Sequence, residues 1–102
     1  MADIDSREYA VSPDRLFEIL QESLPHAGFK IRKIEKEIRR IELSTGMSLF
    51  SFGESLEVIV SANGTGSVLY VKSKAKIAWN ISADTQGKVD TLFGIIKERL
   101  RS

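Results

Sequence analysis

The chain offers few of the residue types that catalysis or metal binding needs. His26 is the single histidine, in the segment PHAG, and there is no cysteine. The lack of cysteine excludes thiol nucleophiles, thiolate metal ligands and disulfides. One histidine completes no catalytic triad, so an exposed residue between two elements is the simpler interpretation of His26. The aspartates show no ligand spacing such as that of a calcium-binding loop. We therefore expect no enzyme activity, no metal and no cofactor.

Basic residues cluster in the segment KIRKIEKEIRR, residues 30–40. The candidates for binding an anion or a nucleic-acid phosphate are Lys30, Arg32, Arg39 and Arg40. Acidic residues are interleaved with them and nearly cancel their charge, so the field at a phosphate would be weak. A solvated charged face is the favoured interpretation, and the sequence disfavours nucleic acid as a partner.

The segment TGMSLFSFGE, residues 45–54, is apolar although its two glycines indicate a loop. Its large apolar side chains are Met47, Leu49, Phe50 and Phe52. Burying such a side chain is worth roughly 1.5–3 kcal/mol, so a small domain would not leave all four in water. Three interpretations follow: a part of the core beneath the C-terminal helix, the roof of an apolar ligand site, or a contact with a second copy of the chain.

Trp79 is the only tryptophan and lies in KIAWNIS, just before the C-terminal helix. Anchoring the core is its favoured role, because a buried tryptophan contributes much to a small domain. The alternative is a ligand or partner hot spot. Trp79 therefore joins the apolar segment among the candidate ligand- or partner-binding residues.

The composition indicates a single globular domain over residues 1–102. Hydrophobic residues make up 42% of the chain and charged residues 28%, which excludes wholesale disorder. Fifteen Lys and Arg oppose fourteen Asp and Glu, so the net charge of +1 gives no general attraction to nucleic acid or anionic membranes. No apolar run approaches the roughly 20 residues of a membrane span. The N-terminal MADIDSREYAVS also lacks the apolar centre of a secretory signal. We expect a soluble, cytoplasmic protein.

Two amphipathic helices are predicted. The first is SPDRLFEILQESL, where Ser12 is the expected N-cap and Pro13 the first helical residue. The second is C-terminal, and its apolar stripe consists of Val89, Leu92, Phe93, Ile96 and Leu100. Gly94 lies close to this stripe, so we expect it to mark a close approach to the sheet.

Strands are predicted for much of the remaining chain. SLEVIVSA and SVLYVKS alternate in polarity, and NGTG between them predicts a hairpin, because Asn63-Gly64 readily adopts positive φ. SREYAVS at the N-terminus is typical of an edge strand. The segment FKIRKIEKEIRRIEL is ambiguous, since its four isoleucines have helical spacing. Their β-branching and the lack of an N-cap favour a hairpin with its turn at residues 35–37.

The predicted order is β-α-β-β-β-β-α, which indicates an α+β fold with an antiparallel sheet and both helices on one face. From Arg7 to Leu100 this order resembles the TBP-like and helix-grip (Bet v 1/START-like) folds. In larger helix-grip proteins the sheet and the long C-terminal helix enclose an apolar ligand cavity, and the resemblance implies such a ligand here. The segment IELSTGMSLFSFGESLEVIV also resembles a small, largely uncharacterised bacterial family, at Thr45, Gly46, residues 48–53 and Glu54.

Three functional hypotheses follow. The main one is a non-enzymatic binding or assembly module that forms a homo-oligomer, as a dimer, through residues 47–52 or a sheet edge. The alternative is a small helix-grip domain that binds an apolar, lipid-like ligand. The third, and the least favoured of the three, is weak nucleic-acid binding through the basic segment 30–40.

Overall fold

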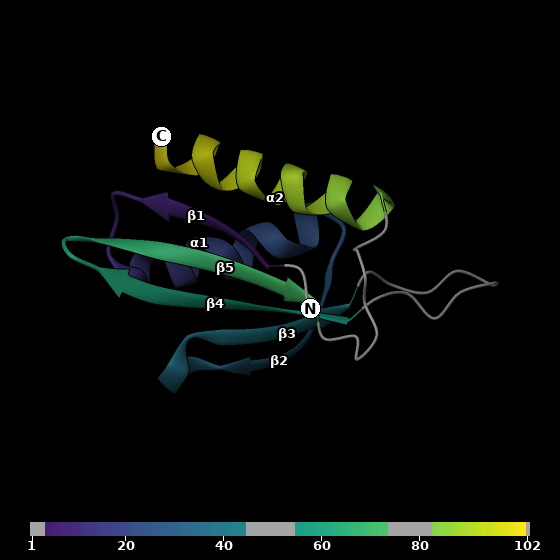
Figure 1. Cartoon of the computed structure of the whole chain (residues 1–102), viewed down its shortest axis with the longest axis horizontal. Helices are drawn as coiled ribbons and strands as arrows, with labels where there is room; N and C mark the ends of the chain where they lie inside the picture. Colours follow the sequence, from purple (N-terminus) through teal and green to yellow (C-terminus); the bar gives the residue numbers. More distant parts are fainter. Residues whose placement is uncertain (1–3, 45–54, 74–82, 102) are drawn as a thin grey trace.

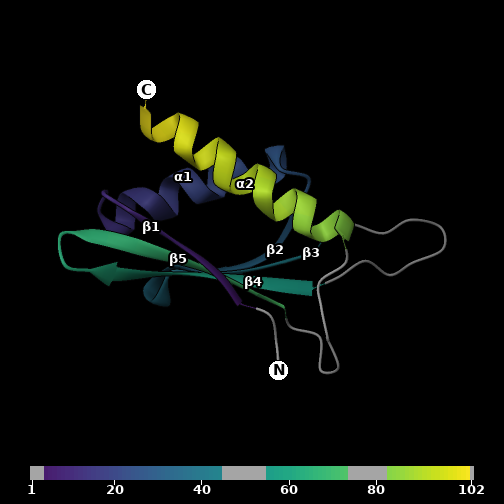
Figure 2. The ribbon, with the colours of Figure 1, turned by 45° about the horizontal axis from the view of Figure 1, so that its top comes forward.

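Residues 4–44, 55–73 and 83–101 are described by a computed structural model, and they form one sheet covered by two helices. The elements are β1 (Ile4–Tyr9), α1 (Pro13–His26), β2 (Lys30–Glu35), the 3₁₀ turn η1 (Lys36–Ile38), β3 (Arg40–Ser44), β4 (Ser55–Asn63), β5 (Gly66–Ser73) and α2 (Ala83–Arg101). All strand pairs are antiparallel, in the order β1-β5-β4-β3-β2. Both helices lie on the same side of the sheet (Figures 1 and 2). The predicted α+β class and element order are confirmed.

Helix α1 begins as its sequence predicts. Ser12 has an extended backbone, and its side-chain oxygen accepts a hydrogen bond of 3.2 Å from the backbone N–H of Arg15. Pro13 follows as the first helical residue, where its missing N–H leaves no bond unmade. The helix ends at His26, and the backbone N–H of Phe29 then donates to the carbonyl of Leu24 at 3.1 Å. This bond turns the chain directly into β2.

The ambiguous segment 29–43 is a hairpin, and its turn explains why its residues lack turn chemistry. The short helix η1 connects β2 to β3, and Arg39 then takes a left-handed conformation with φ 50°. This conformation is unfavourable for a residue with a side chain. Arg39 is held by an ion pair of 2.8 Å with Asp14 at the start of α1. A contact between distant parts of the chain therefore replaces the glycine that a local turn signal would have shown.

The second hairpin is also confirmed, with its turn one residue later than predicted. Asn63 belongs to β4 and pairs with Gly66 of β5, so the turn consists of Gly64 and Thr65. Gly64 has φ 61°, whereas Arg39 is the one non-glycine residue with positive φ in the described ranges. A side chain at Gly66 would bring its Cβ within 2.5 Å of the carbonyl oxygen of Tyr9, so β1 passes too close for any larger residue.

Alternation along the strands separates a covered face of the sheet from an open one. The covered face meets α1 and α2 in one cluster, whose fully buried members are Leu16, Leu20, Leu24, Ile41, Leu43, Leu56, Val58, Leu69, Val71, Val89, Leu92 and Ile96. Each helix therefore contributes the apolar stripe that its sequence predicts. The open face carries Glu57, Ile59, Ser61, Tyr70 and Lys72 and has no helix over it (Figure 2).

Gly94 does not mark a close approach of α2 to the sheet, so that prediction is wrong. A Cβ placed on Gly94 would have no neighbouring atom within 4 Å, and the same holds for Gly87 one face away on the same helix. Both glycines are exposed. Tight packing therefore does not require either of them, and each weakens the helix.

We expect Gly87→Ala and Gly94→Ala to stabilise the protein, each by about 0.5–1 kcal/mol, because alanine restricts the unfolded chain and meets no obstacle in the folded one. Urea unfolding followed by circular dichroism measures the change. Gly66→Ala is the control and should destabilise, since its Cβ would collide with the backbone of Tyr9. Loss of stability in both helix variants would contradict the open surroundings of these glycines.

Candidate ligand-binding site

Helix α2 crosses the covered face of the sheet but packs mainly on α1. Helix α1 contacts β2, β4 and β5 directly, whereas α2 has its most extensive contacts with α1 and fewer with any strand. Its inward residues Val89, Leu92 and Ile96 are nonetheless at most 1% exposed. Side chains rather than a close backbone approach therefore connect α2 to the sheet.

Three contacts at the margins hold α2 in place. Near its start, the aliphatic stem of Lys88 covers Gly28, whose added Cβ would lie 3.3 Å from it. Near its end, Arg99 forms an ion pair of 2.9 Å with Glu22 of α1. Between them, the guanidinium carbon of Arg7 on β1 lies 4.5 Å from the ring centre of Phe93.

A hollow of about 400 Å³ opens between the edge strand β1 and the middle of α2. It is lined by Arg7, Glu8, Tyr9, Phe93, Gly94 and Lys97. Phe93 is 8% exposed and belongs to the core cluster, while Tyr9 packs against that cluster from its rim. Because Gly94 has no side chain, nothing from α2 fills this space at that position. The hollow therefore has an aromatic floor that continues into the core.

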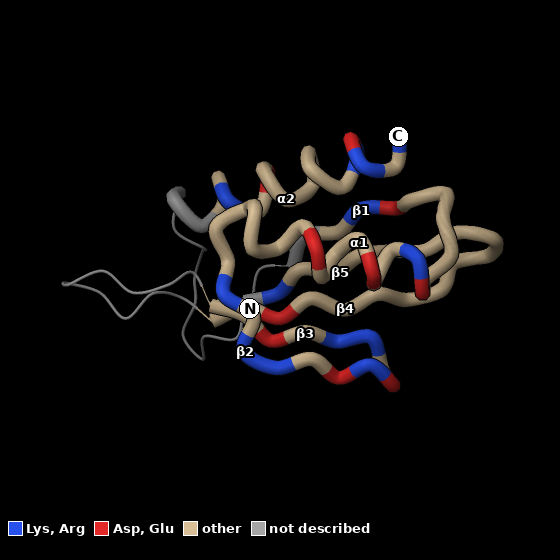
Figure 3. Tube along the Cα trace, turned by 180° about the vertical axis from the view of Figure 1, so that it is seen from behind, with Lys and Arg blue, Asp and Glu red and all other residues tan. Residues whose placement is uncertain are grey.

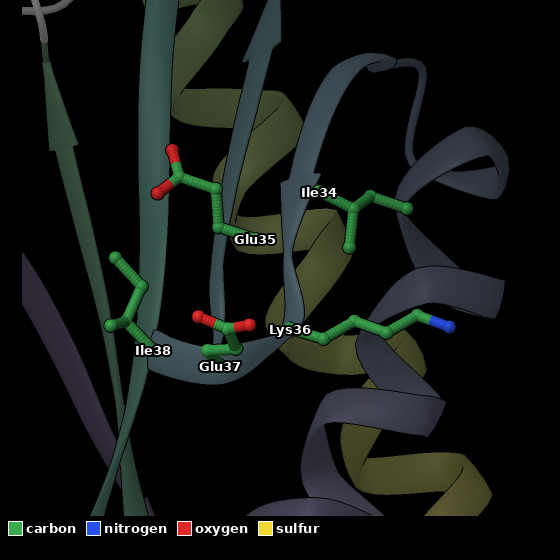
Figure 4. Close-up of a pocket in the computed structure, with 5 residues that line it drawn as sticks. All are labelled: Ile34, Glu35, Lys36, Glu37 and Ile38. Atoms are coloured by element: carbon green, nitrogen blue, oxygen red, sulfur yellow. The ribbon is translucent and has the colours of Figure 1, made fainter.

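Two other hollows lie away from the core cluster. One of about 320 Å³ is formed at the tip of the β2–β3 hairpin by residues 34–38. Ile34 and Lys36 extend to one side there and Ile38 to the other (Figure 4), and the two isoleucines are 38% and 56% exposed. The second hollow, about 360 Å³, lies on the open face around Ile59 and Tyr70. Neither is lined by a member of the core cluster, so the hollow beside β1 is the better candidate for an apolar ligand.

The open face of the sheet carries a network of charges centred on Arg40. Its Nε donates to Glu57 at 2.6 Å, and its Nη1 lies 2.7 Å from Glu35 and 3.2 Å from Glu42. Lys72 completes the network with an ion pair of 3.1 Å to Glu57. The strand register places these residues side by side across β2, β3, β4 and β5. One cation thus binds three carboxylates, while a second shares one of them.

The network shifts the protonation equilibria of its central pair. Burial by itself would raise the pKa of Glu57, but hydrogen bonds from Lys72 and Arg40 outweigh it and hold the pKa below its usual range. The hydrogen bond to Glu57 raises the pKa of Arg40 further above neutrality. Both groups are therefore charged at neutral pH and stabilise each other.

The structure spreads the predicted anion-binding residues instead of gathering them. Lys30 and Arg32 are exposed on β2, at one edge of the sheet. Arg39 binds Asp14, and Arg40 is directed at its three carboxylates. Figure 3 shows basic and acidic segments interleaved along β2 and β3, as the sequence indicates.

The predicted apolar candidates lie outside the described residues. They are Met47, Leu49, Phe50, Phe52 and Trp79, and their roles in the core, a ligand site or an interface stay predictions. The described ends of the chain around them are placed: Ser44 pairs with both Lys30 and Ser55, and Leu56 pairs with Ser73. Strands β3, β4 and β5 therefore meet these segments at one end of the sheet.

Polar groups suited to catalysis are sparse in the described part of the chain. His26 is exposed at the end of α1, in agreement with its simpler interpretation. Within residues 4–44, 55–73 and 83–101 there is no group of three His, Asp or Glu side chains that could hold a metal ion. Neither α1 nor α2 is long and apolar enough to cross a membrane.

The hollow beside β1 was not found from the sequence. Phe93 was assigned to the apolar stripe and Lys97 to the opposite, charged face, and both positions are correct. Their meeting with Arg7 depends on the crossing of α2 over β1, which no local pattern reports. The one available signal was Gly94, a helix-weakening residue beside an apolar stripe.

We expect Glu57→Gln to cost about 1–3 kcal/mol of stability at pH 7, because it removes charge-assisted hydrogen bonds from Arg40 and Lys72. Since the pKa of Glu57 is lower in the folded state, its stabilisation is present above the unfolded pKa, about 4.3, and is lost as pH falls through the folded pKa. The variant should therefore lose less stability than the wild type between pH 5 and pH 3, flagged here as roughly the window that follows from linkage.

Urea unfolding at several pH values measures this difference. Glu18→Gln is the matched control, because the Glu18–Arg15 pair is 3.4 Å long and more than half exposed on both sides, and such pairs contribute little. An equal effect of the two substitutions would contradict the network's role.

Comparison with known proteins identifies the fold. No family model matches the sequence, and no curated protein matches it. Among solved structures, Ara h 8.0201 superposes with a TM-score of 0.70 at 13% identity, covering 97% of this chain and 96% of that one. A START superfamily protein from Mycobacterium smegmatis gives 0.61 at 11% identity, covering 98% and 97%. The Zhui aromatase/cyclase from a Streptomyces species gives 0.60 at 11% identity, covering 100% and 96%.

These neighbours are proteins of the Bet v 1/START-like, helix-grip kind. Identities this low show a shared fold and carry no activity from one protein to another. The resemblance of residues 45–54 to a small bacterial family stays a prediction. The described part of the chain has the helix-grip fold, with a five-stranded sheet and the C-terminal helix α2 across it.

Proposed function

We propose that the protein binds a small apolar ligand between α2 and the sheet, seated in the hollow beside β1. The carrying observation is the position of Phe93, which forms both the floor of this hollow and part of the core. A ligand in the hollow would therefore bury apolar surface against the core cluster. The volume, about 400 Å³, falls in the range of small-molecule sites.

The packing of α2 supports this location. Because its strand contacts are made by side chains and its backbone contacts mainly α1, a small shift of α2 widens the hollow without breaking the sheet. Among helix-grip proteins, the resemblance implies a ligand at the boundary between the sheet and the C-terminal helix, and the hollow lies at that boundary. The apolar ligand, the alternative in the sequence analysis, thus has more support than assembly, the main hypothesis.

The proposal is for binding alone. One structural neighbour is named as an aromatase/cyclase, but its 11% identity carries no reaction over to this chain. The charged and aromatic residues of the hollow are assigned no chemical step.

Gly94→Leu tests the site, because its side chain would occupy the hollow. We expect the neutral dye N-phenyl-1-naphthylamine to gain fluorescence on binding the wild type. Gly94→Leu should weaken this binding by at least about fivefold, the equivalent of roughly 1 kcal/mol of lost apolar contact. Gly87→Leu is the matched control on the same helix and should leave the affinity unchanged.

Both leucine variants should fold, since leucine is a better helix former than glycine and neither position has a neighbour within 4 Å of an added Cβ. Thermal unfolding checks this before dye titration. A wild type that takes up no dye, or equal weakening in the two variants, would remove the proposed site. Native mass spectrometry of the purified protein then asks whether an apolar molecule is retained from the cell.

Self-association through residues 47–52 is a separate proposal, since these residues lie outside the described ranges. The described edge at β2 gives it little support. That strand carries a register shift between Ile31 and Lys33 and basic side chains along its length, features that discourage pairing with another strand. Sedimentation velocity at micromolar concentration should show a dimer if the segment associates, and a monomer at all concentrations would contradict it.

A further inference from the structure

We propose that the ligand of the hollow beside β1 is an anionic amphiphile, with a carboxylate bound by Arg7 and Lys97 and an apolar tail directed toward Phe93. This inference rests on the proposed function and names the class of ligand that the same hollow takes. It is carried by the placement of two cations around an aromatic floor.

Arg7 is oriented into the hollow by β1 and by Phe93. The register of β1 with β5 pairs Arg7 with Leu69, whose side chain is in the core, so Arg7 lies on the covered face of the sheet. Its guanidinium carbon lies 4.5 Å from the ring centre of Phe93, and its Nη1 donates to the carbonyl of Ser6 at 2.8 Å. Stacking on the ring fixes the plane of the guanidinium, which carries N–H donors in a fork that matches a carboxylate.

Lys97 supplies the second positive charge from α2. It follows Phe93 by four residues and Gly94 by three, so the three positions share one face of the helix. Its side chain is exposed, and it forms no ion pair with any residue in the described ranges. The ammonium can therefore turn toward an anion in the hollow without losing an existing partner.

The acidic residue that lines the hollow does not cancel these charges. Of the six lining residues Glu8 is the one carboxylate, and alternation along β1 places its side chain on the opposite face from Arg7 and Tyr9. There it accepts a hydrogen bond of 3.2 Å from the side-chain amide of Asn63. The side of the hollow that faces α2 thus carries two cations, and this favours an anion.

The aromatic floor decides between a free anion and an amphiphile. A free inorganic anion would leave Phe93 and Tyr9 without contact, whereas an apolar tail would cover them. The missing side chain at Gly94 provides the width for such a tail beside the helix backbone. Head and tail therefore have separate places within one hollow of about 400 Å³.

Competition between two probes with the same tail tests this assignment. Decanoate and decanol displace N-phenyl-1-naphthylamine from the wild type at pH 7.5 and low salt, and the ratio of their potencies measures the contribution of the carboxylate. We expect decanoate to be more potent by about tenfold, the equivalent of one charge-assisted hydrogen bond. Added salt should reduce this ratio, because exposed charges are screened.

Two double variants with the same change in charge locate the anion. In Arg7→Gln/Lys97→Gln the preference for decanoate should fall to about twofold or less, with decanol unaffected, because only the charged contacts are removed. In Lys30→Gln/Arg32→Gln, on the opposite edge of the sheet, it should be retained. Lys97→Gln alone, at an exposed position, should lower the preference by about threefold and carries no risk to folding.

Each outcome bears on a different claim. Equal potency of decanoate and decanol in the wild type would overturn the anionic head while leaving the apolar site. Equal loss of the preference in both double variants, or its survival in Arg7→Gln/Lys97→Gln, would place the anion elsewhere and also overturn the inference. No dye binding by the wild type would remove the proposed function itself, and this inference with it.

Discussion

The apolar covered face of the sheet is the constraint on which the rest of the structure depends. Five antiparallel strands direct alternate side chains to two faces, and the chain supplies helices for one of them. Leu56, Val58 and Leu69 occupy the centre of that face, and burying them requires both amphipathic helices. The connections follow from this need: α1 packs on the strands first, and α2 then closes what α1 leaves uncovered.

The two helices do this work differently, and the candidate site results from the difference. Helix α1 has a complete N-cap and lies directly against β2, β4 and β5. Helix α2 carries glycines at positions where larger residues would fit, and it contacts mainly α1. The place where α2 leaves β1 partly uncovered is the place where a core residue, Phe93, lines a surface hollow. Incomplete covering of the sheet thus provides a ligand site without a separate domain.

The open face is stabilised by charge instead of burial. Arg40, Glu57 and Lys72 lie on three adjacent strands, and their contacts hold the pKa of Glu57 below its usual range. On a face without a helix, such cross-strand pairs help fix the register that the apolar side requires. The same contacts engage Arg40, which the sequence marked as a candidate for binding an outside anion. Charge that resembles a binding patch in one dimension is thus part of the sheet's own structure in three.

The sequence by itself determined the elements, because each depends on neighbours in the chain. The N-cap at Ser12, the stripe that includes Leu92 and Ile96, and the alternation in β4 all report local geometry, and the structure confirms them. Residues 29–43 were undecided, because their turn depends on an ion pair between Arg39 and the distant Asp14. The candidate site is a stronger case of the same limit. Arg7 and Phe93 are 86 residues apart by their numbers, and only the packing of α2 across the edge strand brings the guanidinium onto the ring. Local sequence patterns encode which face of an element is buried, whereas tertiary packing decides which faces meet, since that depends on the covering of the whole sheet.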